Sequence, residues 1–492
     1  GLGRLIQVDE ITHLDDEGQL SESLQCWTTR YEYNLNDQLT QITDSQNNIT
    51  TFAYDGLKRN LFIHDPDRGV KRFLYDDASN LLESINANNQ RITYTYDCIN
   101  RILTEQYHDG QPVPQWRSLV PIQEDGQQKV STNSITYHYD KPFPNLAQGD
   151  NSMQTARNVK GQLAWVEDLS GEEHISYDSR GRVEWIVKCI PHPQFLYAFA
   201  VGNTNCGNIL LVSYKTTYNY DSADRVTRLI YPDNDEISYR YNQRSLLDHI
   251  VGGASGLTHN GLIIQHIQYQ PSNQEADIHY GNGLRTTSSY DPCLRLIRLR
   301  AVSCKIAINQ QLVNLQYSYD GVSNIRMIED LRPIVVIHEG NLRRNTRLFQ
   351  YDNLYRLTRA QYSCHAPGQP VQNDGEIHYR YDRIGNMLAQ SSTLTNHIEH
   401  GLPVADLGDM DSGGVAGRWY RLGRAATDPP GPHALTSIRH SPFADRQYTY
   451  DANGNVVVLN GLTNTWNFKD RLVATENEEM RAVYIYDYSG QR

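Results

Sequence analysis

A Tyr-Asp pair that recurs along the chain constrains the fold more than any other feature of the sequence. Among the 492 residues there are twelve such pairs, which begin at residues 54, 75, 96, 139, 177, 220, 290, 319, 351, 381, 450 and 486. A degenerate copy at Tyr33 and the first three pairs follow one another at intervals of 21 residues, and the same interval separates Tyr220 from a second degenerate copy at Tyr241. A fixed period of this length predicts one small structural unit that is repeated and stacked on its neighbours.

Other positions of the repeat show which kind of unit it is. Ten of the twelve pairs have an aromatic residue two positions before the Tyr, and ten have Arg or Asn five positions after it. Alternate residues of a β-strand share a face, so each copy is predicted to place two rings side by side on one surface. The residues predicted to build the repeat are Tyr54, Asp55, Arg59, Tyr75, Asp76, Asn80, Tyr96, Asp97, Arg101, Tyr177, Asp178, Gly181, Arg182, Tyr220, Asp221, Arg225, Tyr351, Asp352, Arg356, Tyr381, Asp382, Gly385, Asn386, Tyr450, Asp451, Gly454, Asn455, Tyr486 and Asp487.

The residues after each Tyr predict a turn. In the copies at 177–182, 381–386 and 450–455 a glycine precedes the Arg or Asn. We expect the aspartate to accept hydrogen bonds from backbone NH groups two or three residues on, and the glycine to adopt a positive φ. The unit is therefore a strand, an Asp-led turn and a second strand. Such hairpins are marginal alone and must stack edge to edge, so we predict an all-β fold: a long antiparallel strip of tandem hairpins that spirals into a hollow shell, because sheet twist has a fixed hand.

The repeat spans the whole chain, which predicts a single repeat array over residues 1–492 rather than separate domains. Its period loosens at three insertions, at about 105–135, 186–212 and 401–432, which we interpret as loops. The chain starts at Gly1 rather than Met and ends within a copy of the motif at Arg492. We therefore expect it to be part of a larger polypeptide, with any export signal outside these residues.

Charge and composition exclude several classes of function. The chain has 57 acidic and 45 basic residues spread along its length, with a net charge of −12, whereas nucleic-acid binders carry a clustered basic surface. We therefore expect no nucleic-acid partner, and no membrane span, since no run of about 18 apolar residues occurs. Tyr occurs 33 times and Phe 9 times, which suits a sheet buried on one side, because tyrosine can pack its ring while its hydroxyl stays in water.

Motifs that carry chemistry are missing from the sequence. There is no G-x-S-x-G, no phosphate-binding loop and no H-E-x-x-H, so we predict that the chain is not an enzyme and has no cofactor or metal. The seven cysteines lack a repeated spacing, which indicates mostly free or structural thiols. Cys189, His192 and Cys206 offer three soft ligands, but a structural zinc site normally has four. The aspartates at 406, 409 and 411 lack the acidic residue that closes a calcium loop, so a solvated turn is the better interpretation.

The aromatic ladder has two interpretations. Stacked rings suit the faces of sugars, and repeated rings also suit packing between neighbouring repeats. We favour packing against neighbouring repeats. The Tyr-Asp pairs do not indicate paired-carboxylate catalysis, since an active site is needed once and the aspartate already has a role in the turn.

The C-terminal copies are the most specific part of the sequence. Residues 348–357 read Leu-Phe-Gln-Tyr-Asp-Asn-Leu-Tyr-Arg-Leu, residues 379–387 read Tyr-Arg-Tyr-Asp-Arg-Ile-Gly-Asn-Met, and residues 484–492 read Tyr-Ile-Tyr-Asp-Tyr-Ser-Gly-Gln-Arg. Over essentially its whole length the chain resembles the Rhs (rearrangement-hotspot) and YD-repeat proteins, a group that includes bacterial toxin-complex B and C components and the animal teneurins. In this family a self-cleaving Asp-Pro-x-Gly type segment follows the repeats and closes the shell, and the chain ends before such a segment.

This resemblance implies a strip of sheet that spirals into a cocoon around a C-terminal toxin. The expected function is the structural wall of a secreted Rhs-type toxin container. Its expected partners are the toxin or effector cargo, the remaining shell segments of the parent polypeptide, and secretion or translocation components. The alternative is an extracellular adhesion or carbohydrate-binding protein of the teneurin kind. A third, minor alternative is an enzyme whose site lies in the 186–212 or 401–432 insertion.

Overall fold

The fold was examined in a computed structural model of the chain. The residues that the structure describes are 3–15, 20–108, 121–124, 127–130, 134–143, 155–168, 170–191, 211–253, 261–303, 310–332, 346–363, 375–394, 408–412, 431–439 and 445–492. Within these ranges the regular structure consists of β-strands without a helix, and no helix could therefore cross a membrane there. The predicted all-β class is confirmed.

The described residues form thirty-six strands that follow one another in sequence. The first eighteen are β1 (Gln7–Leu14), β2 (Leu20–Tyr33), β3 (Leu39–Thr43), β4 (Ile49–Tyr54), β5 (Asn60–Asp65), β6 (Gly69–Tyr75), β7 (Leu81–Ile85), β8 (Arg91–Tyr96), β9 (Ile102–His108), β10 (Pro121–Glu124), β11 (Gln127–Val130), β12 (Ser134–Tyr139), β13 (Leu163–Glu167), β14 (Glu172–Tyr177), β15 (Val183–Pro191), β16 (Leu211–Tyr220), β17 (Val226–Ile230) and β18 (Glu236–Tyr241). The others are β19 (Leu247–Gly252), β20 (Leu262–Tyr269), β21 (Glu275–Tyr280), β22 (Leu284–Tyr290), β23 (Leu296–Ser303), β24 (Gln310–Tyr319), β25 (Ile325–Asp330), β26 (Thr346–Tyr351), β27 (Leu357–Ser363), β28 (Gly375–Tyr381), β29 (Met387–Ser392), β30 (Gly408–Ser412), β31 (Leu435–Arg439), β32 (Arg446–Tyr450), β33 (Val456–Leu459), β34 (Leu462–Trp466), β35 (Leu472–Glu476) and β36 (Arg481–Val483).

These strands form one continuous antiparallel strip. Thirty-four of the described strands belong to a single sheet, and β10 and β11 form a separate hairpin. In the strip each strand pairs with the strand before it and the strand after it, and β9 pairs directly with β12. The long antiparallel strip predicted from the period is therefore confirmed.

A β-bulge recurs where a strand ends in the tyrosine of the repeat. In β4, Ala53 pairs with Phe62 whereas the next residue, Tyr54, pairs with Asn60, so the partner strand has one extra residue. The same register shift precedes the tyrosine in β2, β6, β8, β12, β14, β16, β18, β20, β22, β24, β26, β28 and β32. A bulge bends its strand and increases local twist, so a bend is added to the strip with each repeat.

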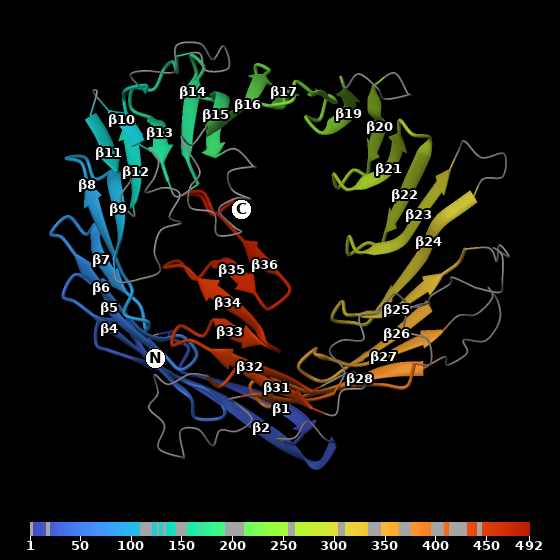
Figure 1. Ribbon diagram of the computed structural model, residues 1–492. Coiled ribbons are helices and arrows are strands. Elements are labelled where there is room, and N and C mark those ends of the chain that lie inside the picture. Colours follow the sequence, from blue (N-terminus) through green and yellow to red (C-terminus); the bar gives the residue numbers. More distant parts are fainter. Residues whose placement is uncertain are drawn as a thin grey trace.

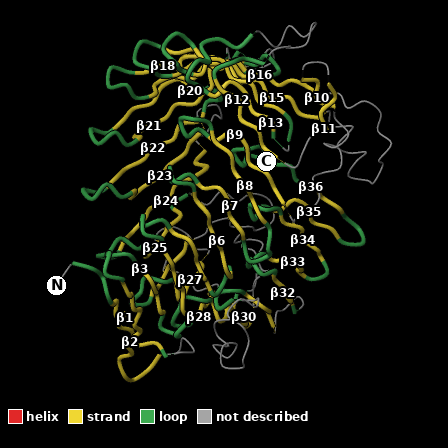
Figure 2. The backbone as a smooth tube through the Cα atoms, turned by 90° about the vertical axis from the view of Figure 1, so that its left-hand side faces the viewer, coloured by secondary structure: helices red, strands yellow, loops and turns green. Residues whose placement is uncertain are grey.

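The bent strip curves round into a ring (Figure 1). The strands run from β1–β9 through β12–β19 and β20–β28, and the C-terminal strands β32–β36 lie inside the ring. Viewed from the side, β33–β36 lie beside β6–β9 (Figure 2). The end of the chain thus begins a second winding along its start.

Buried hydrophobic residues form clusters at several places along the strip. One buried cluster contains Trp165, Ile175, Trp185 and Val187 of β13–β15. Another joins residues of β8, β9, β12 and β13 to Phe468, which lies in the turn between β34 and β35. Elsewhere many strand residues are only half-buried, as is typical of a wall one sheet thick.

Parts of the three insertions are strands of the sheet. Residues 186–191 and 211–212 belong to β15 and β16, residues 105–108 to β9, and residues 408–412 form β30. These portions are strands, where the sequence was interpreted as loops. The structure also describes the β10–β11 hairpin and residues 134–135 and 431–432. The rest of the three insertions lies outside the described residues.

Candidate functional site

The repeat turns are built around the aspartate. Oδ1 of Asp55 accepts hydrogen bonds from the amides of Leu57 and Arg59, each at 2.9 Å, two and four residues on. The amide of Lys58, three residues on, instead donates to the main-chain carbonyl of Asp55 at 3.1 Å. The sequence predicted that the aspartate side chain accepts from the amides two or three residues on, whereas it accepts from those two and four residues on. The amide three residues on is already bonded to the main-chain carbonyl of the aspartate. The turns at Asp97, Asp178, Asp320, Asp352, Asp382 and Asp451 make the same pair of Oδ1 contacts.

The left-handed position of the turn is not reserved for glycine. Gly181, Gly385 and Gly454 have φ values of 79°, 95° and 83°. At the same place in other copies, Leu294 and Tyr355 both have φ of 63°. Both of these side chains are exposed. The free-energy cost of a positive φ at these positions therefore comes from the backbone. The glycine signal therefore identifies only some of the turns.

The arginine of the repeat joins one turn to the next. Nε of Arg356 donates to Oδ2 of Asp352 at 2.7 Å, and its Nη1 donates to the main-chain carbonyl of Asp382, in the next copy, at 2.8 Å. Its guanidinium also lies over the ring of Tyr381, 5.0 Å from the centroid. The same three contacts are made by Arg59, Arg182 and Arg295. Arg101 contacts Asp97, Asp140 and Tyr139, and Arg225 contacts Asp221 and Tyr241.

Asparagine replaces this arginine in some copies and keeps the contact within the turn. Nδ2 of Asn386 donates to Oδ2 of Asp382 at 2.9 Å and also to the carbonyl of Pro432 at 3.0 Å. Nδ2 of Asn80 bonds Asp76 in the same way, at 2.8 Å. Asn455 donates to Asp451 and to Asp470. Arg and Asn are therefore equivalent as partners of the aspartate, although only Arg stacks on the next tyrosine.

The tyrosine of the repeat bonds to the copy before it. The hydroxyl of Tyr96 donates to the carbonyl of Leu81 at 2.9 Å, and burial raises the pKa of this phenol. Corresponding bonds are made by Tyr177, Tyr220, Tyr241, Tyr269, Tyr290, Tyr319, Tyr351 and Tyr450. A copy can thus be bonded backward through its tyrosine and forward through its arginine. This explains why both residues recur with the period.

Two aromatic residues of β9 and β12 pack against the C-terminal part of the chain. Tyr107 of β9 stacks on Phe468 with ring centroids 5.0 Å apart, and Tyr137 of β12 meets Tyr488 edge-on at 6.0 Å. Phe468 and Tyr488 both belong to the C-terminal part of the chain, which lies inside the ring (Figure 1). At these two places the strip is therefore covered by a second layer of the same chain.

The turns near the C-terminus meet early parts of the strip along a seam. Nδ2 of Asn88 donates to Asp451 at 3.0 Å, and Gln46 donates to Asp382 at 3.1 Å. The sequence separations of contacts along this part of the seam, 336 to 366 residues, measure one winding of the strip. Asp382 and Asp451 therefore accept hydrogen bonds both within their own turns and across the seam.

A polar cluster closes the seam at the end of the chain. Asp487 accepts a hydrogen bond from Lys188 of β15, and Tyr488 donates its hydroxyl to Glu173 at 2.9 Å and its amide to Asp168 at 2.7 Å. Burial opposes ionisation of Asp487, but Lys188 and the neighbouring donors outweigh it and keep its pKa below the ordinary value. The sequence did not identify Lys188, Glu173 or Asp168, because they stand outside the repeat pattern.

Comparison with known proteins bears on the fold. No protein-family model and no curated protein matches the sequence. The crystal structure of TcdB2-TccC3 matches with a TM-score of 0.69 and 16% identity, over 100% of this chain and 23% of that chain. The chain has the fold of these toxin-complex chains. The TcdB2-TccC3-Cdc42 structure gives a TM-score of 0.70 at 17% identity over the same shares, and the Photorhabdus luminescens Tc holotoxin pore gives 0.69 at 17% over 99% and 22%.

The toxin-complex fold confirms the expected likeness at the level of architecture. The chain spans less than a quarter of the length of the toxin-complex chains that it matches. At 16–17% identity the likeness concerns the fold. The likeness therefore does not assign the activities and partners of those proteins to this chain.

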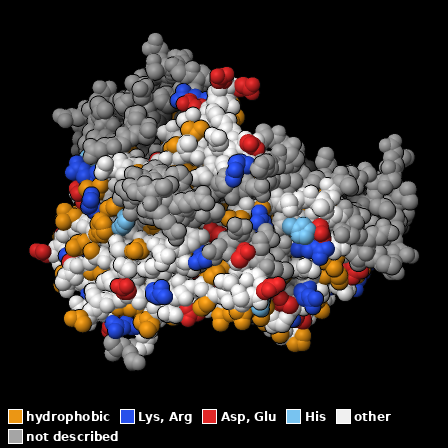
Figure 3. Space-filling model, turned by 90° about the horizontal axis from the view of Figure 1, so that it is seen from below, with side chains coloured by type: hydrophobic (Ala, Val, Ile, Leu, Met, Phe, Trp, Pro, Cys, Tyr) orange, Lys and Arg blue, Asp and Glu red, His pale blue; other side chains and the backbone are white. Residues whose placement is uncertain are grey.

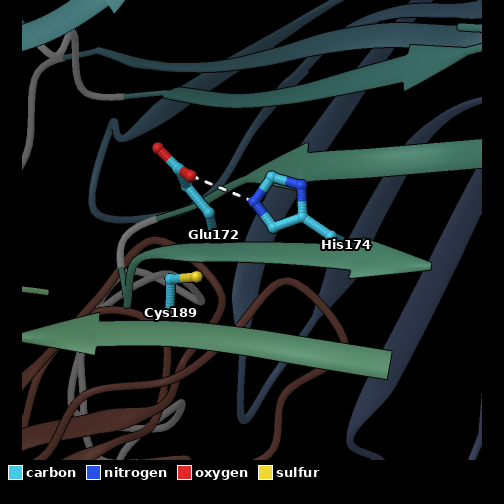
Figure 4. A group of neighbouring side chains, drawn as sticks. All are labelled: Glu172, His174 and Cys189. Carbon is cyan, nitrogen blue, oxygen red and sulfur yellow. Dashed lines mark hydrogen bonds and ion pairs between the residues drawn. The ribbon is translucent and has the colours of Figure 1, made fainter. Parts of the chain in front are cut away.

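Among the described residues, one group of side chains could hold a metal ion. The sequence does not favour a metal site at the soft side chains of Cys189, His192 and Cys206, and the last two of these residues lie outside the described residues. The structure instead brings Cys189 together with Glu172 and His174 of β14 (Figure 4). The aspartates at 409 and 411 lie in β30, and residue 406 lies outside the described residues.

Proposed function

We propose that this chain is part of the wall of a container that encloses a toxin or effector segment until delivery. The observation that carries the proposal is the toxin-complex fold, which matches over 100% of the chain. The contacts of Tyr107 and Tyr137 with the C-terminal part of the chain add support, because rings on the wall can pack against a segment that lies inside the ring. The chain would act as a structure rather than as a catalyst, and it would be exported from the producing cell.

The proposed partners follow from this role. They are the cargo segment, further wall segments of the same polypeptide, and the secretion or translocation components that deliver the assembly. The seam supports the second of these, because turns at one edge of the strip already bind an earlier winding through side-chain hydrogen bonds.

An adhesion role is the second candidate, and one observation favours it. Exposed apolar side chains recur at the tips of the repeat turns, at Leu57, Ile99, Leu294, Val322 and Tyr355. A row of apolar tips along one edge could bind another protein. On the face seen from below, however, hydrophobic and charged side chains are interspersed (Figure 3), as is typical of a surface in water.

Limited proteolysis of the complete gene product that contains this chain tests the container proposal. We expect a segment outside residues 1–492 to resist protease in the intact protein. It should be cleaved faster in a Lys188→Ala, Asp487→Ala double variant, because that variant weakens the seam. Equal cleavage of all outside segments in both proteins, or the absence of any such segment, would reject the container. Binding of the intact surface to cells or glycans, without protection of any segment, would favour adhesion.

A further inference from the structure

The pairing register of β14 and β15 brings three potential metal ligands to one face of the sheet. Glu172 and His174 are alternate residues of β14, so their side chains share a face. Glu172 pairs directly with Cys189 of β15, which places the thiol on the same face. One ligand atom of each residue lies within 4.8 Å of the others, and Figure 4 shows Glu172 beside the His174 ring, with Cys189 on the neighbouring strand.

The donor set suits zinc. Zn²⁺ is bound in proteins by cysteine sulfur, histidine nitrogen and carboxylate oxygen, at about 2.0–2.3 Å and with tetrahedral angles. Ligands in that geometry lie roughly 3.3–3.6 Å apart, so closing the observed group on one ion needs a shift of about 1 Å. Glu172, the least buried of the three, can supply most of this movement. Its Oε2 and Nε2 of His174 are already only 3.1 Å apart.

The surroundings hold two of the ligands in place. His174 and Cys189 are only 1% and 3% exposed. The His174 ring lies nearly parallel to Trp165, with centroids 5.9 Å apart, and meets Phe143 edge-on at 5.4 Å. Oγ of Ser213 lies 3.5 Å from Sγ of Cys189, where it can donate to a metal-bound thiolate. Such outer-shell partners orient metal ligands and tune their affinity.

We propose that Glu172, His174 and Cys189 bind one Zn²⁺ ion. On binding, the Cys189 thiol releases its proton to solvent and its sulfur bonds the metal, while the contact between His174 and Glu172 is replaced by two bonds to the ion. The fourth position, on the side of Glu172, is left to water. The ion would clamp β14 to β15 beside the turn that joins β13 to β14. The site is independent of the proposed container function.

Titration of the purified, metal-free chain with Co²⁺ tests the site. Cobalt is a spectroscopic substitute for zinc, and a cysteine ligand gives a sulfur-to-cobalt charge-transfer band in the near ultraviolet. We expect this band to appear and saturate at one Co²⁺ per chain, and to disappear when Zn²⁺ is added. The Cys189→Ser variant should lose the band, whereas the control Cys293→Ser, which changes an exposed cysteine of a repeat turn, should keep it.

A second variant keeps the test decisive if Cys189→Ser does not fold, as judged by circular dichroism. Glu172→Gln removes the charge of the most accessible ligand. It should weaken Zn²⁺ binding in a competition assay by more than the roughly 10–100-fold that losing an outer-shell partner costs. Absence of the band in the wild-type chain, its persistence in folded Cys189→Ser, or unchanged zinc affinity in Glu172→Gln would overturn the proposal.

Discussion

At the scale of the residue, the repeated aspartate works as a hydrogen-bond acceptor. The Arg225 side chain, with backbone donors of the same turn, holds the pKa of Asp221 below its ordinary value although burial opposes ionisation. Asn80 has the corresponding effect on the pKa of Asp76. A carboxylate stabilised in its charged form by partners in its own turn is suited to shaping the backbone rather than to transferring protons. The same aspartate therefore recurs without implying an active site.

A substitution at Gly385 tests the left-handed position of the turn. Its φ is +95°, and a Cβ added there would meet nothing within 4 Å, so any cost comes from the backbone. We expect Gly385→Val to destabilise the chain by about 1–2 kcal/mol, because a β-branched residue disfavours positive φ. The midpoint of urea unfolding measures this. The control Gly385→Asn should be nearly neutral, since asparagine tolerates this region, and equal stability of the Val variant would contradict the turn assignment.

At the scale of the element, a single hairpin is secured mainly by its neighbours. The tyrosine hydroxyl bonds the preceding copy and the arginine bonds the following one, as Tyr351 and Arg356 show for the copy at 351–356. The period could be read from the sequence because these contacts are local in the array. The bulge before each tyrosine could not, since it is a property of the pairing between two strands.

Substitution of Arg356 tests the bridge between copies. The Asp352 side chain is 4% exposed and bonds Arg356 at 2.7 Å. We expect Arg356→Leu to cost roughly 2–4 kcal/mol, because it leaves a buried carboxylate without its cation. Arg356→Asn should cost clearly less, since asparagine fills this place in other copies and bonds the aspartate. Chemical unfolding of both variants measures the difference. Equal decreases in the free energy of unfolding would show that Arg356 contributes by packing and not by bonding the aspartate.

At the scale of the whole molecule, the seam determines how the strip closes. Contacts 299 to 366 residues apart join the last copies to earlier parts of the strip, as far along the chain as β15. Nζ of Lys469 lies 2.6 Å from Oε2 of Glu105, and Lys188 contacts both Asp487 and Glu173. The seam is therefore rich in charges as well as rings, which makes its strength dependent on pH.

Acid is expected to weaken the seam through Asp487. Its pKa is lower in the folded chain than the ordinary value of about 4. Its contribution to stability is therefore complete above that value and is lost as the pH falls through the lower, folded pKa. The urea midpoint of the wild-type chain should fall more steeply below about pH 4 than that of Asp487→Asn. Asp77→Asn, at an exposed position, is the control, and parallel curves for wild type and Asp487→Asn would contradict the assignment.

The sequence by itself determined the unit and the way in which units join. The 21-residue period, the aromatic pairs and the Asp-led turns predicted hairpins in one antiparallel strip, because these features depend on residues a few positions apart. Only the tertiary structure decided how far the strip bends, which turns meet across the seam, and that Glu172, His174 and Cys189 converge. Those outcomes depend on strand register and on many small bends added over a whole winding, and no spacing of residue types along the chain records that sum.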